Sequence, residues 1–474
     1  MTTVSMITQD GGRTAIATEK LDALRGKLRG KLCLPGDPGY DEAGTIWNAM
    51  IDRKPAVIIR AQAAEDVAAA VNFARDNGLL LAVRGGGHNI AGHAVCEGGL
   101  MLDLSLMKSI EVNAAARTVR VAPGVTLGEL DLATQAHGLA LPVGINSTTG
   151  IAGLTLGGGF GWLSRKFGLT IDNLIAADIV TADGTKRRVN EVDEADLFWA
   201  VRGGGANMGV VTSFEFQLHP VGPEVFAGLI VHPFENAPAL LKAYREVVAR
   251  SSDDLTVWVV LRQAPPLPFI PAEWHGREVV VLAFCYVGGV ANGDAAIAPL
   301  RAIGKPIAEH VGGMPLAGWQ TAFDPLLTPG ARNYWKSHDF KELSDGAIGA
   351  IADGVARLPG PECEVFIGSL GGAINRVAAS ATAYPHRDIQ FVMNVHTRWR
   401  DAAQDQTCIA WARGVFDAVA PFATGGVYVN FMPDDEGERV KSGAYGPNFA
   451  RLAALKAKYD PRNLFRLNQN VVAA

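Results

Sequence analysis

Arg84-Gly-Gly-Gly-His-Asn-Ile-Ala-Gly-His93 is the stretch of sequence that decides how the rest of the chain is interpreted. Three consecutive glycines lack a Cβ atom, so the backbone N–H groups of this loop can close on an anion such as a pyrophosphate and adopt positive φ without steric cost. A loop that only holds phosphate does not need the imidazole at His88, which suggests a second role for this histidine on the same ligand. A tight turn with a surface histidine is the alternative that the loop alone leaves open.

The segments before this loop predict a strand, a helix and a second strand. A β-branched run at residues 56–60 predicts the first strand, and apolar residues from Val67 to Ala74 at helical spacing predict a helix that ends at Gly78. Residues 79–83 predict the second strand. The glycine loop then follows the carboxyl end of that strand, where open α/β units tend to place ligands.

Two further glycine-dense runs follow. Strands are expected at residues 100–104, 110–112 and 118–121, and a capping box formed by Thr126 and Glu129 opens a helix. In the run from Gly150 to Gly161, small residues alternate with apolar ones, which lets a large flat group lie against the main chain. The third run, 202–209, lies between strands expected at 175–182 and 210–218.

Residues 219–223 form a breaker cluster rich in proline at which the glycine-dense region stops, so a domain boundary is expected there. Alternating strands at 279–286, 364–370 and 389–395, mixed with helices, predict an antiparallel sheet covered by helices in residues 224–425. Only residues 21–32 look helical in the weakly patterned first 50 residues. Near the end, a short strand is expected at 428–431 and a helix at 448–459, and the polar tail either returns to a ligand or is a solvated terminus.

Composition limits the classes of function. The 474 residues are 48% hydrophobic and 19% charged with a formal net charge of −5, which is typical of a soluble protein of two or three domains without a basic face for nucleic acid. The five cysteines are scattered and never form a C-x-x-C pair, so neither a disulfide framework nor a metal site is encoded. Without a secretion signal or an apolar span, the expected location is the cytoplasm, with no membrane partner.

Common nucleotide and hydrolase motifs are absent. The chain has no G-x-G-x-x-G, no G-x-x-x-x-G-K-[ST], no G-x-S-x-G and no H-E-x-x-H. A nicotinamide enzyme, a P-loop ATPase, a serine hydrolase and a zinc protease are therefore disfavoured, and a glycine-lined ligand with one histidine remains.

Several motifs in one order carry a family resemblance. Besides 84–88 and 150–161, they are Ser164-Arg-Lys-Phe-Gly-Leu169 with Asp172-Asn173, Asp196-Leu-Phe-Trp-Ala-Val-Arg-Gly-Gly-Gly205, and the tail Tyr459-Asp-Pro-Arg-Asn463 with Asn468-Gln-Asn470. Together they resemble the FAD-linked oxidases of the berberine bridge enzyme-like group, within the vanillyl alcohol oxidase/PCMH superfamily. The match spans residues 50–222 and, more loosely, 365–472.

The resemblance implies an α+β protein with a bipartite, PCMH-type FAD-binding domain and a substrate domain whose sheet roofs the flavin ring. The implied division is an FAD-binding domain at 1–222 with its core at 50–222, a substrate-binding domain at 223–425, and a C-terminal return at 426–474. The implied cofactor-binding residues are Arg84, Gly85, Gly86, Gly87, His88, Asn89, Gly92, Thr148, Thr149, Gly150, Gly153, Leu154, Gly157, Gly158, Gly209, Val210, Val211, Asn468 and Asn470.

The resemblance also gives His88 its second role, because in the family the histidine after this glycine run is bonded to the flavin 8α-methyl carbon. Many members carry a second anchor, a cysteine at the position that Asn146 occupies here. A single covalent link through His88 is therefore expected, as in members such as 6-hydroxynicotine oxidase. The missing second link favours a compact, partly enclosed pocket.

Tyr428 is the leading candidate for the catalytic base, because Tyr428-Val-Asn-Phe431 is similar to the family's pocket-facing Y-x-N segment. An ordinary core tyrosine is the alternative. A free tyrosine has a pKa of about 10, so a base role needs a nearby cation or a hydrogen bond to the phenolate. Plant members supply a lysine where Val392 stands, and the tyrosine sometimes used near the flavin histidine is Ile90 here.

Asn394 and Lys336 complete the expected catalytic set. Asn394 falls where relatives carry Gln or a catalytic Glu, and it is expected to orient the substrate. Lys336, in the cluster Tyr334-Trp-Lys336, is expected to stabilise Tyr428 or a substrate oxygen, with an aromatic core pair and a solvated lysine as the alternative.

The implied activity is oxidation of a small alcohol or amine, with O2 as the electron acceptor and H2O2 as the product. Thr149 falls near the family's oxygen-access position, and its modest size suits an oxidase. The alternatives are a flavin dehydrogenase with another acceptor and a flavin-binding protein without turnover. The sequence names neither the substrate nor the oligomeric state.

Overall fold

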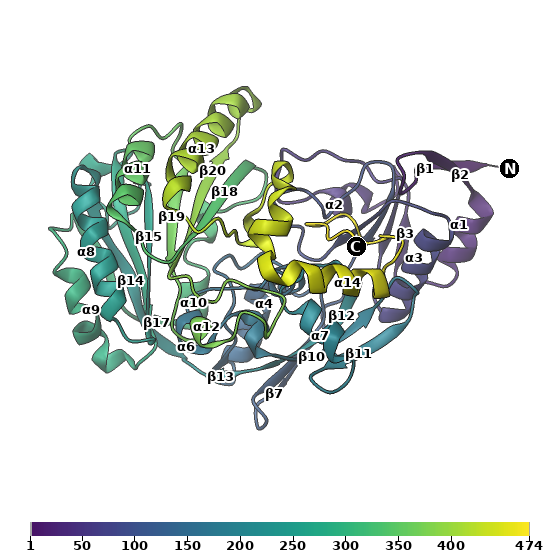
Figure 1. The fold of residues 1–474 in the computed structure, drawn as a ribbon, viewed down its shortest axis with the longest axis horizontal. Helices are drawn as coiled ribbons and strands as arrows, with labels where there is room; N and C mark the ends of the chain where they lie inside the picture. The colour runs from purple at the N-terminus through teal and green to yellow at the C-terminus, as the bar shows by residue number, and fades with distance from the viewer. Residues whose placement is uncertain (1, 474) are drawn as a thin grey trace.

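The computed structural model describes residues 2–473, and its three large sheets confirm the expected α+β class (Figure 1). The first sheet has four strands in the order β3-β4-β6-β5, with β4 and β5 parallel to the central β6. A helix connects β4 to β5 and ends before Gly78, whose φ is +64°. The elements are β3 (Lys31–Cys33), β4 (Val57–Arg60), α3 (Ala64–Asp76), β5 (Leu81–Arg84) and β6 (Leu100–Asp103).

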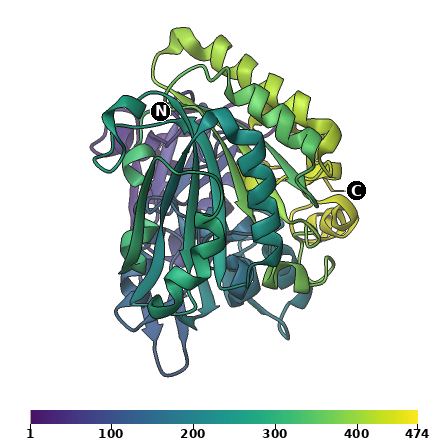
Figure 2. The same ribbon diagram turned by 90° about the vertical axis from the view of Figure 1, so that its left-hand side faces the viewer.

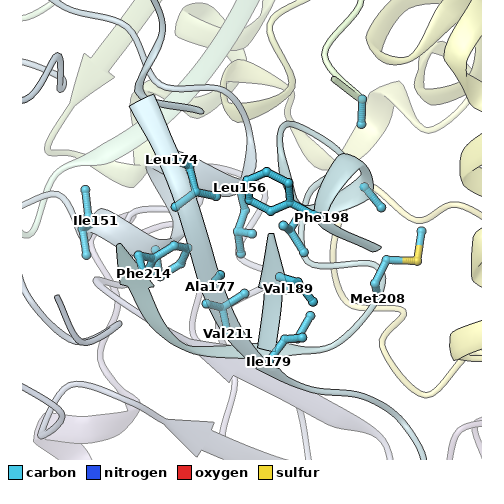
Figure 3. Packing of buried hydrophobic residues seen from close by; sticks show 14 of the residues in the cluster. Ile151, Leu156, Leu174, Ala177, Ile179, Val189, Phe198, Met208, Val211 and Phe214 are labelled. Atoms are coloured by element: carbon cyan, nitrogen blue, oxygen red, sulfur yellow. The ribbon is translucent and has the colours of Figure 1, made fainter. Parts of the chain in front are cut away.

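The second sheet is antiparallel, with the order β11-β10-β12-β8-β7. Its inner face packs against short helices, and Figure 3 shows part of this core, in which Phe214 and Val211 of β12 lie beside Ala177 and Ile179 of β10. The elements are β7 (Ile110–Asn113), β8 (Thr118–Val121), α4 (Leu127–Gln135), α5 (Ile151–Leu156), β10 (Leu174–Val180), β11 (Lys186–Asn190), α7 (Ala195–Val201) and β12 (Val210–Gln217). The expected capping box is confirmed, because the Thr126 N–H donates to Glu129 Oε2 at 2.8 Å.

The third sheet is the predicted antiparallel one, with seven strands in the order β17-β14-β16-β15-β19-β20-β18. Helices cover one of its faces (Figure 2), and neighbouring strand residues point to opposite faces. Val257 and Val259 pack under the helices, whereas Trp258 faces the other side. The elements are β14 (Glu224–Pro233), α8 (Ala237–Arg250), β15 (Leu255–Gln263), β16 (Glu278–Tyr286), α9 (Gly293–Arg301), β17 (Ala308–Pro315), β18 (Arg332–Phe340), α11 (Asp345–Val355), β19 (Glu364–Ser369), β20 (Phe391–Trp399) and α13 (Asp405–Val419).

Smaller elements join these layers. They are α2 (Tyr40–Gly44), β9 (Leu139–Ala140), α6 (Ser164–Phe167), β13 (His219–Pro220), α10 (Leu316–Gln320) and α12 (Ala373–Arg376). Among residues 2–473, no helix combines the length and the apolar character that crossing a membrane requires.

The first 50 residues differ from the prediction. They form a hairpin of β1 (Thr3–Ile7) and β2 (Arg13–Ala17) and a helix, α1 (Thr18–Arg25), that ends earlier than expected. The chain then runs towards β3, because the side chain of Asp66 accepts hydrogen bonds from the N–H groups of Arg29 and Gly30. A Cβ atom on Gly30 would lie 2.0 Å from the carbonyl oxygen of Arg60, so only glycine fits this approach.

The C-terminal segment returns to the first half of the molecule, where α14 (Phe449–Tyr459) lies beside α7 (Figure 1). The strand expected at 428–431 is wrong. The Phe431 N–H donates to the carbonyl oxygen of Tyr428 at 2.9 Å, which closes a 3₁₀ turn, η8 (Val429–Phe431). This turn, and not strand alternation, places Tyr428 and Asn430 together.

Candidate active site

A cavity of about 380 Å³ lies between the glycine loops and the uncovered face of the seven-stranded sheet. Glycines of residues 85–87 and 150–157 line one side. Apolar and aromatic side chains, among them Trp258 and Phe366, line the other. The strand alternation that sends Val257 and Val259 to the helices therefore sends their neighbours to this cavity.

Two of the glycine loops touch backbone to backbone. A Cβ atom on Gly86 would lie 2.3 Å from the backbone nitrogen of Gly150, and one on Gly157 would lie 2.3 Å from Asn430 Oδ1. Gly153 also lines the cavity, yet a Cβ there would meet no protein atom within 4 Å. The wall is thus a bare main-chain cradle, and the unpartnered Asn468 Oδ1 lies beside it. These features fit a large, flat group with phosphates, such as FAD.

The structure brings most of the expected site residues to the cavity. Those that line it are Gly85, Gly86, Gly87, His88, Asn89, Thr149, Gly150, Gly153, Leu154, Gly157, Asn468, Asn394 and Tyr428. Those outside its wall are Arg84, Gly92, Thr148, Gly158, Gly209, Val210, Val211, Asn470 and Lys336. Thr148 supports the wall from behind, because its hydroxyl is hydrogen-bonded to His88.

His88 lines the glycine side of the cavity. Its ring stacks on Trp47 with 5.2 Å between centroids and 19° between planes, and Thr148 Oγ1 lies 3.0 Å from its Nε2. Burial and the nearby Arg84 charge lower the pKa of His88 to about 4, against the opposing hydrogen bond of Thr148. The imidazole is therefore neutral at pH 7.

The neighbours of His88 determine which of its two ring nitrogens carries the proton. The Thr148 hydroxyl donates its hydrogen to Asn146 Oδ1 at 2.7 Å, so it accepts a hydrogen bond from Nε2–H of His88. The lone pair is then on Nδ1, whose contact with Thr149 Oγ1 is the longer one at 3.5 Å. A neutral ring with one unprotonated nitrogen has the nucleophilic character that a covalent bond to carbon requires.

Tyr428 reaches the cavity as a neutral phenol. Burial raises the pKa of Tyr428 to about 12, although hydrogen bonds from Asn430 and Gly159 oppose this shift. Its oxygen accepts from the Gly159 N–H and from Asn430 Nδ2, each at 3.0 Å. The phenol hydrogen remains available to a ligand. Tyr428 is therefore better suited to donate a hydrogen bond than to accept a proton as a base.

Lys336 is not part of the site. Its ammonium donates to Glu436 Oε1 at 2.7 Å and lies 5.0 Å from the centroid of the Phe416 ring, under α13. The preceding residue of β18, Trp335, lines the cavity instead. Because adjacent strand residues face opposite sides, Lys336 cannot stabilise Tyr428 or a substrate oxygen.

Several residues that line the cavity were not predicted from the sequence. Trp47 lies in the weakly patterned first segment, and no local pattern marked it. Glu364 begins an expected strand, His396 lies one residue past the end of another, and Arg262 lies in β15, which was not predicted. The predicted strands carried no assignment of which face meets the ligand, and no local pattern showed which neighbours β15 and β20 bring to β19.

Comparisons with known proteins agree with this arrangement. A family model described as an FAD binding domain matches residues 55–190, and one described as berberine and berberine like matches residues 427–472. An FAD-linked oxidoreductase of Dictyostelium discoideum is 32% identical over 467 residues, covering 98% of each chain. The (R)-6-hydroxynicotine oxidase of Paenarthrobacter nicotinovorans is 29% identical, covering 94% of this chain and 97% of that one.

A solved structure, that of 6-hydroxy-D-nicotine oxidase from Arthrobacter nicotinovorans, superposes with a TM-score of 0.84 at 29% identity, over 94% of this chain and 98% of that one. The expected fold, FAD as cofactor and an oxidoreductase function are thereby confirmed. The chain belongs to the berberine bridge enzyme-like family of FAD-linked oxidoreductases.

Proposed function

We propose that this protein is an oxidase that carries one FAD bonded to His88 and takes a hydride from a small alcohol or amine. The observation that carries this proposal is the neutral His88 ring, with an unprotonated Nδ1, beside a glycine cradle in a mostly apolar cavity. Similarity to a 6-hydroxynicotine oxidase supports the oxidase reading over a dehydrogenase with another acceptor.

Different residues of the site hold different parts of the cofactor. Backbone N–H groups of residues 85–87 bind the pyrophosphate, Thr148 and Asn146 orient the His88 ring, and the tail at 468–470 closes the site. When bound, the flavin supplies the two-electron acceptor, and O2 then receives the electrons as H2O2. Tyr428 donates a hydrogen bond to the substrate, and Asn394 orients it from β20.

The covalent link is a single one. Asn146 stands where a second, cysteinyl anchor would be, and the five cysteines are all buried outside the cavity wall. We expect the protein to keep its yellow colour after acid precipitation and His88→Ala to lose it. Peptide mass analysis should find flavin only on the peptide that contains His88, and a second flavinylated peptide would contradict the single link.

Stopped-flow reoxidation separates the oxidase from its alternatives. The photoreduced protein should reoxidise in air-saturated buffer with one H2O2 formed per flavin. A reduced flavin that persists in air but is bleached rapidly by substrate would indicate a dehydrogenase. Failure of every alcohol, amine and sugar in an anaerobic panel to bleach the flavin would leave a binding protein without turnover.

A further inference from the structure

His396 of β20 lines the cavity and has a polar atom that the proposed function does not use. Its residue is only 7% exposed, it lines the cavity, and its Nε2 has no hydrogen-bond partner. Two residues earlier on the same face of β20, Asn394 Oδ1 is also buried without a partner. An unpaired buried polar atom costs about 1–3 kcal/mol, so both atoms suit a ligand that brings hydrogen-bond partners.

A carboxylate fixes the tautomer of this imidazole. His396 Nδ1 lies 2.9 Å from Glu364 Oε1, and Arg262 donates to the other oxygen, Glu364 Oε2, at 2.8 Å. Burial alone would raise the pKa of Glu364, but the Arg262 charge and the bond to His396 outweigh it, so the pKa lies below its ordinary value. The ionised carboxylate accepts Nδ1–H and leaves the Nε2 lone pair towards the cavity.

The surroundings of His396 contain no other titratable group that competes for this role. Trp335 of β18 meets the ring edge to face at 4.7 Å between centroids, Arg262 and Glu364 approach from β15 and β19, and Arg398 lies two residues along β20. The constellation is a base, a carboxylate that orients it, and a guanidinium that holds the carboxylate.

Two other groups of the wall are poorer proton acceptors. Tyr428 is a neutral phenol whose oxygen already accepts two hydrogen bonds. Burial lowers the pKa of His93 to about 4, and no carboxylate lies within hydrogen-bond distance of its ring. His396 combines a bare nitrogen with a carboxylate that is hydrogen-bonded to its other ring nitrogen, whereas Asp434 acts on His93 only as a more distant charge.

The rest of the wall limits the substrate. Among residues 2–473, the charged side chains that line the wall are Arg262 and Glu364, which neutralise each other, and aromatic and aliphatic groups make up most of the surface. A cation or an anion would lose its hydration here without a free counter-charge, and the few unpartnered polar atoms of the wall, among them Asn394 Oδ1 and His396 Nε2, could not serve the many hydroxyls of a sugar. The fitting ligand has an apolar body and few polar groups, one of them a hydroxyl.

We propose that His396, positioned by Glu364, is the proton acceptor of this cavity, and that its substrate is an uncharged alcohol with an aromatic or alicyclic body. This rests on the proposed function. Nε2 takes the hydroxyl proton as the C–H bond breaks, the hydride and its electron pair leave for FAD, and the C–O bond becomes a carbonyl. One alcohol thus yields one carbonyl compound, one proton on His396 and one two-electron-reduced flavin.

Anaerobic flavin bleaching tests the substrate class with the unmutated holoprotein. The probes are benzyl alcohol and cyclohexanol, glucose and cellobiose, and the permanently charged choline. Reduction by the first pair at least about 100-fold faster than by the others supports the class. Comparable or faster reduction by a sugar or by choline overturns it while leaving the proposed oxidase intact, and no reduction by any probe counts against the oxidase itself.

Variants test the proton acceptor. With the fastest neutral alcohol, His396→Gln should lower the limiting rate of flavin reduction by about 10²–10⁴-fold, leave the Kd within about threefold, and abolish the fall of rate on the acid side of the pH profile. His338→Gln, which removes a buried imidazole outside the cavity wall, is the matched control and should stay within about threefold. An unchanged rate and pH profile in His396→Gln overturns the assignment.

The positioning role of Glu364 is tested by a separate substitution. Because Glu364→Gln alone would leave a buried guanidinium unpaired, the test is the pair Arg262→Gln with Glu364→Gln. Its limiting rate should fall about 10–100-fold while the Kd for the alcohol stays within about threefold, since the imidazole loses the carboxylate that fixes its tautomer. An equal loss of alcohol binding would mean that Glu364 is only structural.

Chemical modification tests the position of His396 without measuring turnover. Diethyl pyrocarbonate acylates neutral imidazole nitrogens, and peptide mass mapping should find His396 acylated in the free holoprotein and protected by saturating cyclohexanol. Acylation that the alcohol does not reduce would overturn the placement of the substrate against Nε2.

Discussion

At the scale of single residues, the site depends on where a Cβ atom fits. Gly86 and Gly153 are both glycines of the cavity wall, but only Gly86 meets protein there, 2.3 Å from the Gly150 nitrogen. We expect Gly86→Ala to fold poorly, with a thermal midpoint at least several degrees lower, because two backbone segments must separate. Differential scanning fluorimetry measures this directly.

Gly153→Ala is the matched variant. No protein atom lies within 4 Å of its Cβ, so we expect normal expression and folding but a reduced flavin content, because the methyl group enters the cradle. The ratio of absorbance at 450 nm to that at 280 nm reports the loss. Full flavin content in both Gly153→Ala and Gly153→Val would show that FAD does not lie against this residue.

At the same scale, a substitution of Tyr428 distinguishes a role in hydrogen bonding to the substrate from a role in proton transfer. If the phenol only donates to the substrate, Tyr428→Phe loses one hydrogen bond of about 0.5–1.5 kcal/mol, so flavin reduction should slow by about 2–13-fold with its pH profile unmoved. Stopped-flow reduction measures both. A loss beyond about 100-fold together with a changed profile would assign the proton to Tyr428 and not to His396.

At the scale of elements, a buried carboxyl joins two helices. Asp131 of α4 is 4% exposed, and Gln320 Nε2 of α10 donates to its Oδ2 at 3.1 Å. Burial raises the pKa of Asp131 from 3.8 to about 7, against the lowering effect of Gln320. Between about pH 4 and pH 7 the native state therefore holds more protons than the unfolded chain, and the free energy of unfolding falls as pH rises through this window.

Asp131→Asn removes this dependence while keeping an acceptor for Gln320. We expect the variant to have a higher thermal midpoint than the parent at pH 8 and nearly the same midpoint at pH 5, since only the ionised carboxylate is costly. Asp417→Asn, on the exposed face of α13, is the control and should change neither value. Parallel curves for parent and Asp131→Asn would refute the shifted pKa.

At the scale of the whole molecule, the C-terminal return is fixed by a fully buried ion pair. Lys456 Nζ donates to Asp460 Oδ2 at 2.7 Å, to the Asn207 carbonyl oxygen at 2.9 Å and to that of Phe465 at 2.8 Å. Both charged side chains are 0% exposed, and these bonds connect α14, the third glycine run and the tail.

We expect Lys456→Met to lower the free energy of unfolding by about 3–5 kcal/mol, because it leaves the Asp460 carboxylate buried without its cation. Urea denaturation measures the change, and limited proteolysis should release the tail first. Lys458→Met, at an exposed position of the same helix, should stay within about 0.5 kcal/mol of the parent. Equal stability of the two variants would contradict the anchoring role.

The sequence by itself determined the local features. Periodicity predicted α3, α14 and the strands around the glycine loop, the capping box at Thr126 is local, and three glycines in a row predicted a main-chain cradle ending at His88. Each depends on residues within one or two turns of chain, where backbone sterics and hydrogen bonds are set by neighbours in sequence.

Only the tertiary structure decided which side chains meet. Lys336 turned to Glu436 under α13, the segment at Tyr428 closed into a 3₁₀ turn, and Trp47 stacked on His88. Arg262 meets Glu364 although 102 residues separate them, and the order of strands in the sheet, which no local pattern encodes, brings His396 beside both. Local sterics therefore set the cradle, whereas strand order and the packing of distant elements set the chemistry facing it.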